Sequence, residues 1–190
     1  MSGLRWLVES DLSGFSLVFG HGLTAPQLLS RMGAYSGTLA LRDEETFFED
    51  FEEELHDPDG HVVTAGRYGE WAWAWEHYGP RRWGNEEALA AVSVGTAALV
   101  LTSNAKAHRT FRYAEDGRRL ACADNLDLDA GTDLDHFRTE LLALGVDPDR
   151  PEDGPVSGLS LAVRLAEGLG IDLPPDGPPV WEGWSARLRP

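Results

Sequence analysis

The segment 20–25, Gly-His-Gly-Leu-Thr-Ala, has the residue types and spacing of a loop that holds phosphate. It fits the loose dinucleotide-binding pattern G-x-G-x-x-G/A, and it lies between a predicted strand and a predicted helix. The free N–H groups at the start of such a helix can bind a pyrophosphate. The candidate ligand-binding residues of this alternative are Gly20, His21, Gly22 and Thr24.

The same segment is also typical of a tight turn that leads into a short capped helix. Pro26 and Gly33 limit this helix to about two turns, whereas the helix of a nucleotide-binding unit is longer. His21 lies between two glycines, and no nearby carboxylate is identified that would orient it as a general base. We therefore expect a structural turn here and assign no catalytic residue.

Residues that bind metals form no recognised pattern. The run 124–135 holds five aspartates, but no register places Asp at positions 1 and 3, Gly at 6 and Glu at 12 of a calcium loop. It is more typical of a strand end followed by a helix cap. The single Cys122 excludes an internal disulfide, and it lies in a predicted strand. The sequence thus predicts neither a metal site nor a cofactor.

A predicted helix over 43–55 concentrates negative charge. Residues 43–59 contain ten carboxylates and no Lys or Arg, while Phe47, Phe51 and Leu55 recur at the spacing of a buried helical face. One interpretation is a solvated face on a helix that these apolar residues hold to the core. The other is a docking surface that attracts a basic protein partner. The partner-binding candidates are Glu45, Glu49, Glu52, Glu53 and Glu54.

Residues 71–77 alternate with the period of a strand, and one side of that strand carries Trp71, Trp73, Trp75 and His77. Three indoles supply about as large an apolar patch as a monomer normally leaves exposed. This Trp stripe is therefore either a wall of the core or a recognition surface. We expect a core wall, with the helix over 47–55 as its cover.

The charge balance limits the partners of the chain. Sixteen Lys and Arg against 32 Asp and Glu give a formal net charge of −16, which excludes nucleic acid and anionic membrane as expected partners. A basic protein partner is compatible with this charge. Because no apolar run approaches the ~20 residues of a membrane span and the N-terminus does not resemble a signal peptide, we expect a cytoplasmic protein.

The order of predicted elements indicates the α+β class, with a central antiparallel hairpin-rich sheet and helices packed mainly on one face. We expect a single domain over 1–173 and a Pro-rich extended C-terminal tail over 174–190, pinned by Trp181 and Trp184. Strands are predicted over 15–19, 38–41, 61–67, 70–77, 96–102, 109–114 and 118–123. Helices are predicted over 24–33, 43–55, 86–92 and 157–169, and from Asp133 or Asp135 to Leu144.

Four segments occur together in a familiar order: 22–33, Trp73-Ala-Trp-Glu76, Ser93–Thr96 and 104–117. As a set they resemble a family of actinobacterial proteins of unknown function, over roughly residues 15–145. The resemblance implies a self-standing bacterial cytoplasmic protein. It transfers no catalytic residue, since the family has no established activity.

Three functions fit these observations. The first is a non-catalytic protein-interaction or ligand-recognition domain, regulatory or immunity-like, that uses the acidic helix to bind a basic protein. The second is an enzyme that acts on a nucleotide or another small molecule at the loop 20–24. The third is an accessory subunit whose C-terminal stretch docks onto a larger assembly. We favour the first, which is not an enzyme, and the enzyme remains an open alternative.

Overall fold

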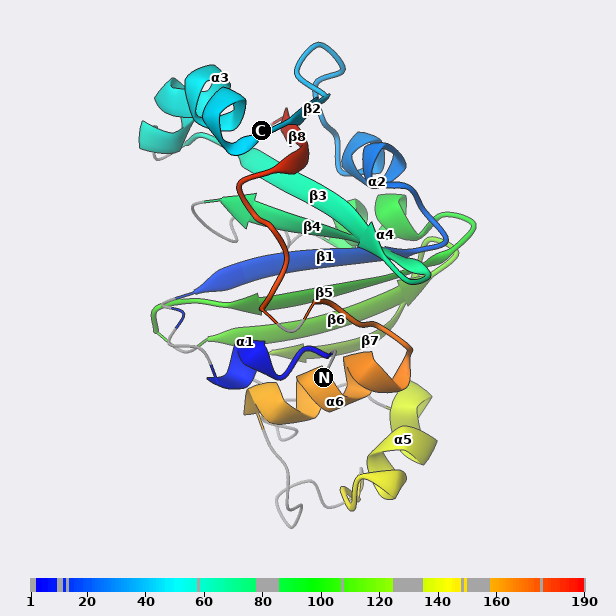
Figure 1. Cartoon of the computed structure of the whole chain (residues 1–190). Helices are drawn as coiled ribbons and strands as arrows, with labels where there is room; N and C mark the ends of the chain where they lie inside the picture. The colour runs from blue at the N-terminus through cyan, green and yellow to red at the C-terminus, as the bar shows by residue number, and fades with distance from the viewer. Residues whose placement is uncertain are drawn as a thin grey trace.

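The computed structural model describes residues 3–9, 12, 14–57, 59–77, 86–106, 108–124, 135–147, 149, 158–174 and 176–189. These residues form eight strands, six α-helices and one 3-10 helix (Figure 1). The strands are β1 (Phe15–His21), β2 (Ala40–Arg42), β3 (Val62–Tyr68), β4 (Trp71–His77), β5 (Ala97–Ser103), β6 (Arg109–Glu115), β7 (Arg118–Asp124) and β8 (Gly183–Arg187). The helices are α1 (Trp6–Glu9), α2 (Ala25–Arg31), α3 (Glu44–His56), α4 (Glu86–Ser93), η1 (Asp135–Phe137), α5 (Arg138–Ala143) and α6 (Gly158–Gly168).

The strands form one antiparallel sheet in the order β2-β8-β3-β4-β1-β5-β6-β7. The strands predicted over 61–67 and 70–77, and those predicted over 109–114 and 118–123, form the hairpins β3–β4 and β6–β7. Gly69 and Gly117 lie in their turns at φ of 57° and 76°, a backbone conformation that glycine adopts without strain. The predicted α+β class with a central antiparallel sheet is therefore confirmed.

Helices cover both faces of the sheet, although the sequence led us to expect most of them on one face. Helices α1, α5 and α6 pack on the face that carries Leu17 and Phe19, and α2 and α4 pack on the opposite face with Val18 and Val100. The reason is that both faces of the central strands are apolar, so each needs a cover. Figure 1 shows α6 and α1 together along one side of the sheet.

The Trp stripe is a core wall, as predicted, but its cover differs from the prediction. Trp71 and Trp73 are 4% and 3% exposed, and they belong to the core cluster of α1, α5 and α6. The indole of Trp71 donates to the carbonyl of Leu169 at 3.3 Å, and Trp75 stacks on Trp6 at 6.3 Å. The indoles are thus covered by α1, α6 and the segment that follows α6, and α3 covers only His77 at the end of the stripe.

The C-terminal stretch 174–190 contains a strand of the sheet. Residues 183–187 form β8, which pairs antiparallel with β2 and with β3. Trp184 packs against the core and Trp181 against α3. The expectation of an extended tail is therefore wrong for 183–187, because backbone pairing with two strands satisfies N–H and C=O groups that a tail would leave to water.

The helix predicted from Asp133 or Asp135 begins differently. Residues 125–134 lie outside the described part of the chain, and with them Asp133. Asp135 opens the 3-10 turn η1, and α5 then starts at Arg138 with no side-chain cap hydrogen bond. Across the residues that the structure describes, no helix has the length and apolar character needed to cross a membrane.

Candidate functional site

Helix α3 lies at the end of the sheet formed by β2, β8 and β3 (Figure 1). It starts where Asp43 accepts a hydrogen bond from the Thr46 N–H at 2.9 Å. Hydrogen bonds from the Thr46 hydroxyl and N–H lower the pKa of Asp43, since they favour the charged carboxylate. Acidic residues in the first turn also suit the positive end of the helix dipole.

One face of α3 fixes the helix to the core. Phe47, Phe51 and Leu55 are 0%, 2% and 8% exposed, and they form a separate cluster with Val62 and the partly buried Trp181. This is the face that the sequence spacing predicts. The opposite face of the helix is left to solvent and carries the partner-binding candidates.

Two basic side chains neutralise part of the charge on α3. Arg187 Nη1 lies 2.9 Å from Glu54 Oε1, and Arg42 Nε lies 2.7 Å from Asp50 Oδ2. Glu54 is therefore half-buried in an ion pair, which sets it apart from the other candidates.

The other four candidates are exposed: Glu45, Glu49, Glu52 and Glu53. Within the described ranges, no Lys or Arg forms an ion pair with any of them. We call these four residues the acidic face of α3. It presents fixed negative charge on a helix that the core holds in place.

His77 lies directly behind α3 and is only 4% exposed. Its ring stacks on Trp181 with 4.6 Å between ring centroids and contacts Phe47 at 5.0 Å. Burial lowers the pKa of His77 to about 4, although a hydrogen bond to the backbone of Val180 acts in the opposite direction. The imidazole is therefore neutral at pH 7, and its Nε2 lies 3.0 Å from the hydroxyl of Thr64.

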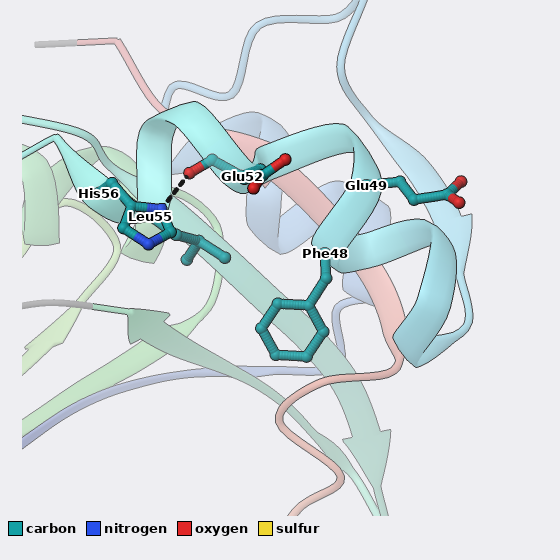
Figure 2. Close-up of a pocket in the computed structure, with 5 residues that line it drawn as sticks. All are labelled: Phe48, Glu49, Glu52, Leu55 and His56. Atoms are coloured by element: carbon teal, nitrogen blue, oxygen red, sulfur yellow. Dashed lines mark hydrogen bonds between the residues drawn. The ribbon is translucent and has the colours of Figure 1, made fainter.

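A groove of about 460 Å³ runs along the flank of α3. In Figure 2, Phe48 and Leu55 project from the same side of the helix, and Glu49 extends outward. Phe48 is 42% exposed, and its ring lies 5.0 Å from that of Trp181. The residues that line the groove are Phe48, Glu49, Glu52, Leu55 and His56.

Sequence reasoning missed this groove, although part of its signal is in the sequence. Phe48 lies at the edge of the buried face of Phe47, Phe51 and Leu55, and one helical turn before Glu52. An aromatic residue at the edge of a buried face, next to a carboxylate, is the feature that would have indicated a binding surface. Its contact with Trp181 is not visible in the sequence.

The loop 20–24 is explained by packing and capping. Thr24 Oγ1 accepts from the Gln27 N–H, and the Gln27 side chain accepts from the Thr24 N–H, which together make a capping box. A Cβ on Gly20 would lie 2.7 Å from Leu23 Cδ1, so this glycine makes room for a side chain of the core.

The neighbours of the loop also differ from those of a nucleotide-binding unit. The preceding strand, β1, lies between two antiparallel neighbours, whereas that unit has a parallel crossover. Gly22 is at φ 65° in the turn, and the exposed His21 contacts Trp71 edge-on. The four candidate ligand-binding residues, Gly20, His21, Gly22 and Thr24, lie close together. However, the Gln27 N–H near the start of α2 donates to Thr24 within the loop.

Tyr113 on β6 also has a strongly shifted pKa. Burial raises the pKa of Tyr113, and the neighbouring Glu115, which accepts its hydroxyl hydrogen bond, adds to the shift. The ring also stacks on His136. These contacts describe a buried structural tyrosine. In the described part of the chain, no group of three or more His, Cys, Asp or Glu is placed to hold a metal.

The chain belongs to DUF6461, a family of unknown function, whose pattern matches residues 5–169. This finding confirms the resemblance to an uncharacterised family and extends it beyond residues 15–145 at both ends. The chain matches no curated protein and no solved structure. Its function must therefore be argued from its own surface.

Proposed function

We propose that this protein is a non-catalytic interaction domain, regulatory or immunity-like, that binds a basic protein partner through the acidic face of α3. The single observation that carries the proposal is the contrast between the two sides of this helix. One side is fixed by buried aromatic residues, and the other presents four exposed carboxylates without an ion pair among the described residues.

The rigid anchoring of α3 supports a role in recognition. A partner that binds a preformed surface does not have to order it first, so less binding energy is lost. Negative charge gathered on one such surface also attracts a basic partner over a Debye length and speeds association. We also propose that the protein is actinobacterial and cytoplasmic, as the sequence led us to expect.

The test is affinity capture from the native host with three forms of the full chain. The first is wild type, and the second is the charge-reversal variant Glu45→Lys, Glu49→Lys, Glu52→Lys and Glu53→Lys. The third reverses the same number of exposed carboxylates elsewhere: Glu9→Lys, Glu70→Lys, Glu140→Lys and Asp176→Lys. Glu54 is left unchanged because its half-buried ion pair with Arg187 contributes to the fold, whereas Glu9 and Glu70 lie in exposed ion pairs.

We expect wild type and the control variant to capture the same basic protein in stoichiometric amount at low salt, and the charge-reversal variant to lose it. Captured proteins are identified by mass spectrometry, and circular dichroism shows that all three forms are folded. Retention should fall as salt rises, because exposed charges are screened. If all three forms captured the basic protein equally, the acidic face would be only a solvated surface and the proposal would be wrong.

A further inference from the structure

We infer that the groove beside α3 binds an arginine side chain of the basic partner, with its guanidinium between the ring of Phe48 and the carboxylate of Glu52. This inference rests on the proposed function and deepens it, since it names the residue type that the partner supplies. Two observations support it: the way in which the chain binds its own arginines, and the chemistry of the groove.

Helix α3 already binds two arginines in this manner. Arg42 pairs with Asp50 at 2.7 Å, and its Cζ lies 4.6 Å from the centroid of the Phe51 ring. Arg187 pairs with Glu54 at 2.9 Å. Its Cζ lies 5.2 Å from the ring centroid of Tyr35. Each guanidinium combines a carboxylate of α3 with an aromatic face.

The groove offers the same combination on another flank of the helix. The Phe48 ring is partly exposed, Glu52 follows it by one turn, and Glu49 adds a second carboxylate. As far as the structure describes the chain, no Lys or Arg pairs with these carboxylates or lies over the Phe48 ring. This set therefore has the chemistry of the two arginine sites and faces outward.

The other polar groups of the groove favour a donor of hydrogen bonds. His56 Nδ1 lies 2.6 Å from the carbonyl of Glu52. Because a carbonyl only accepts, this nitrogen carries the hydrogen. The two carboxylates and the π face of Phe48 attract a cation with N–H groups.

Arginine fits this set better than lysine does. The guanidinium is planar, so it can stack on an aromatic ring while its edge donates two hydrogen bonds to one carboxylate. An ammonium group is a strongly hydrated point charge without a flat face. The groove should therefore distinguish peptides of equal charge that differ only in these residues.

The experiment measures binding of labelled nona-arginine and nona-lysine peptides to the full chain by fluorescence anisotropy. The variants are Phe48→Ala, Phe48→Leu and Glu52→Gln, and the matched control Glu70→Gln removes one exposed carboxylate from the β3–β4 turn. Phe48→Leu keeps an apolar side chain without a π face. Its result therefore remains informative if the alanine variant folds poorly.

We expect wild type to bind nona-arginine more tightly than nona-lysine. A cation–π contact at an exposed site corresponds to roughly a two- to fivefold change in Kd. Both Phe48 variants should lose that preference. Glu52→Gln should weaken nona-arginine binding by a larger factor than Glu70→Gln.

Equal Kd values for the two peptides on wild type, or an unchanged preference in both Phe48 variants, would overturn the inference. The proposed function is tested separately by the charge-reversal variant of Glu45, Glu49, Glu52 and Glu53. If that variant loses both peptides while the Phe48 variants bind as wild type does, the acidic face docks basic chains without an arginine groove. If it binds both peptides as wild type does, the proposed function fails as well.

Discussion

The buried His77 should make the stability of the fold sensitive to mild acid. In the folded protein burial holds the pKa of this imidazole at about 4, against 6.5 for an unperturbed histidine. At pH values between these two, the unfolded chain binds a proton at His77 and the folded chain does not. The unfolded state binds more protons there, so the free energy of unfolding falls as the pH falls.

The magnitude follows from the two pKa values. The stabilisation is fully present above about pH 6.5 and is lost progressively as the pH drops toward 4. Between pH 7 and pH 5, His77 alone should reduce the free energy of unfolding by about 2 kcal/mol. The ring is 4% exposed, so solvent screening does not reduce this value appreciably.

The assay is urea unfolding of wild type and His77→Gln at pH 7 and at pH 5. Glutamine keeps a donor and an acceptor for Thr64 and the backbone of Val180 but does not titrate, so its stability should fall by about 2 kcal/mol less than that of wild type over this pH interval. The control is His108→Gln, since His108 is exposed. Equal losses of stability in wild type and His77→Gln would refute the assignment of a neutral His77.

Three further predictions concern the stability of the fold. Phe47→Ala should lower the free energy of unfolding by roughly 3–5 kcal/mol because the ring is fully buried. Phe48→Ala should change it by less than about 1 kcal/mol because Phe48 is 42% exposed. Urea unfolding measures both losses, and similar values would contradict this difference in burial. Gly20→Ala should cost roughly 1–3 kcal/mol through its contact with Leu23. Nucleotides added to wild type should leave its Tm unchanged, and a dose-dependent increase would instead favour phosphate binding at the loop 20–24.

Local patterns predicted the elements of this fold well because those patterns have local causes. The alternation of residues 71–77 requires a strand, and the spacing of Phe47, Phe51 and Leu55 requires a helix with one buried face. The helices predicted over 24–33 and 43–55 begin at Thr24 and Asp43, and both side chains accept the hydrogen bond of a helix cap. Each of these features depends on residues within one or two turns.

The errors concern which segment covers which surface. An apolar stripe indicates that it is buried but does not name its cover, and here the indoles are covered by α1, α6 and the segment that follows α6. The sheet register of β8 is set by β2 and β3, which lie more than 100 residues earlier. The Pro-rich composition around β8 predicts an extended chain, and a strand is extended too. A strand differs from an extended tail only in its hydrogen bonds to neighbouring strands, and these neighbours are distant in the sequence.

A long-range contact of the same kind lies beside the groove. The residues that line the groove all belong to α3, but Trp181, whose ring packs beside Phe48, comes from the segment that leads into β8. A prediction that treats 174–190 as a tail cannot place an indole beside α3. The mistaken tail therefore hid the aromatic neighbour of Phe48.

Beyond its first turn, the charge on the acidic face of α3 is not arranged to stabilise the helix. Glu45, Glu49 and Glu53 follow one another at four-residue spacing, and each like-charge pair of this kind costs ~0.2–0.5 kcal/mol. Glu52 and Glu53 also lie near the negative end of the helix dipole, where lysine would be favourable. If these glutamates only stabilised the fold or kept the protein soluble, they would not need to lie at these positions.

Anchoring by the core tolerates the repulsion, and a basic partner would relieve it. Reversal of Glu52 and Glu53 in the charge-reversal variant should thus suit the dipole better than the native residues do. Loss of partner binding in that variant would therefore report on the surface and not on unfolding of α3.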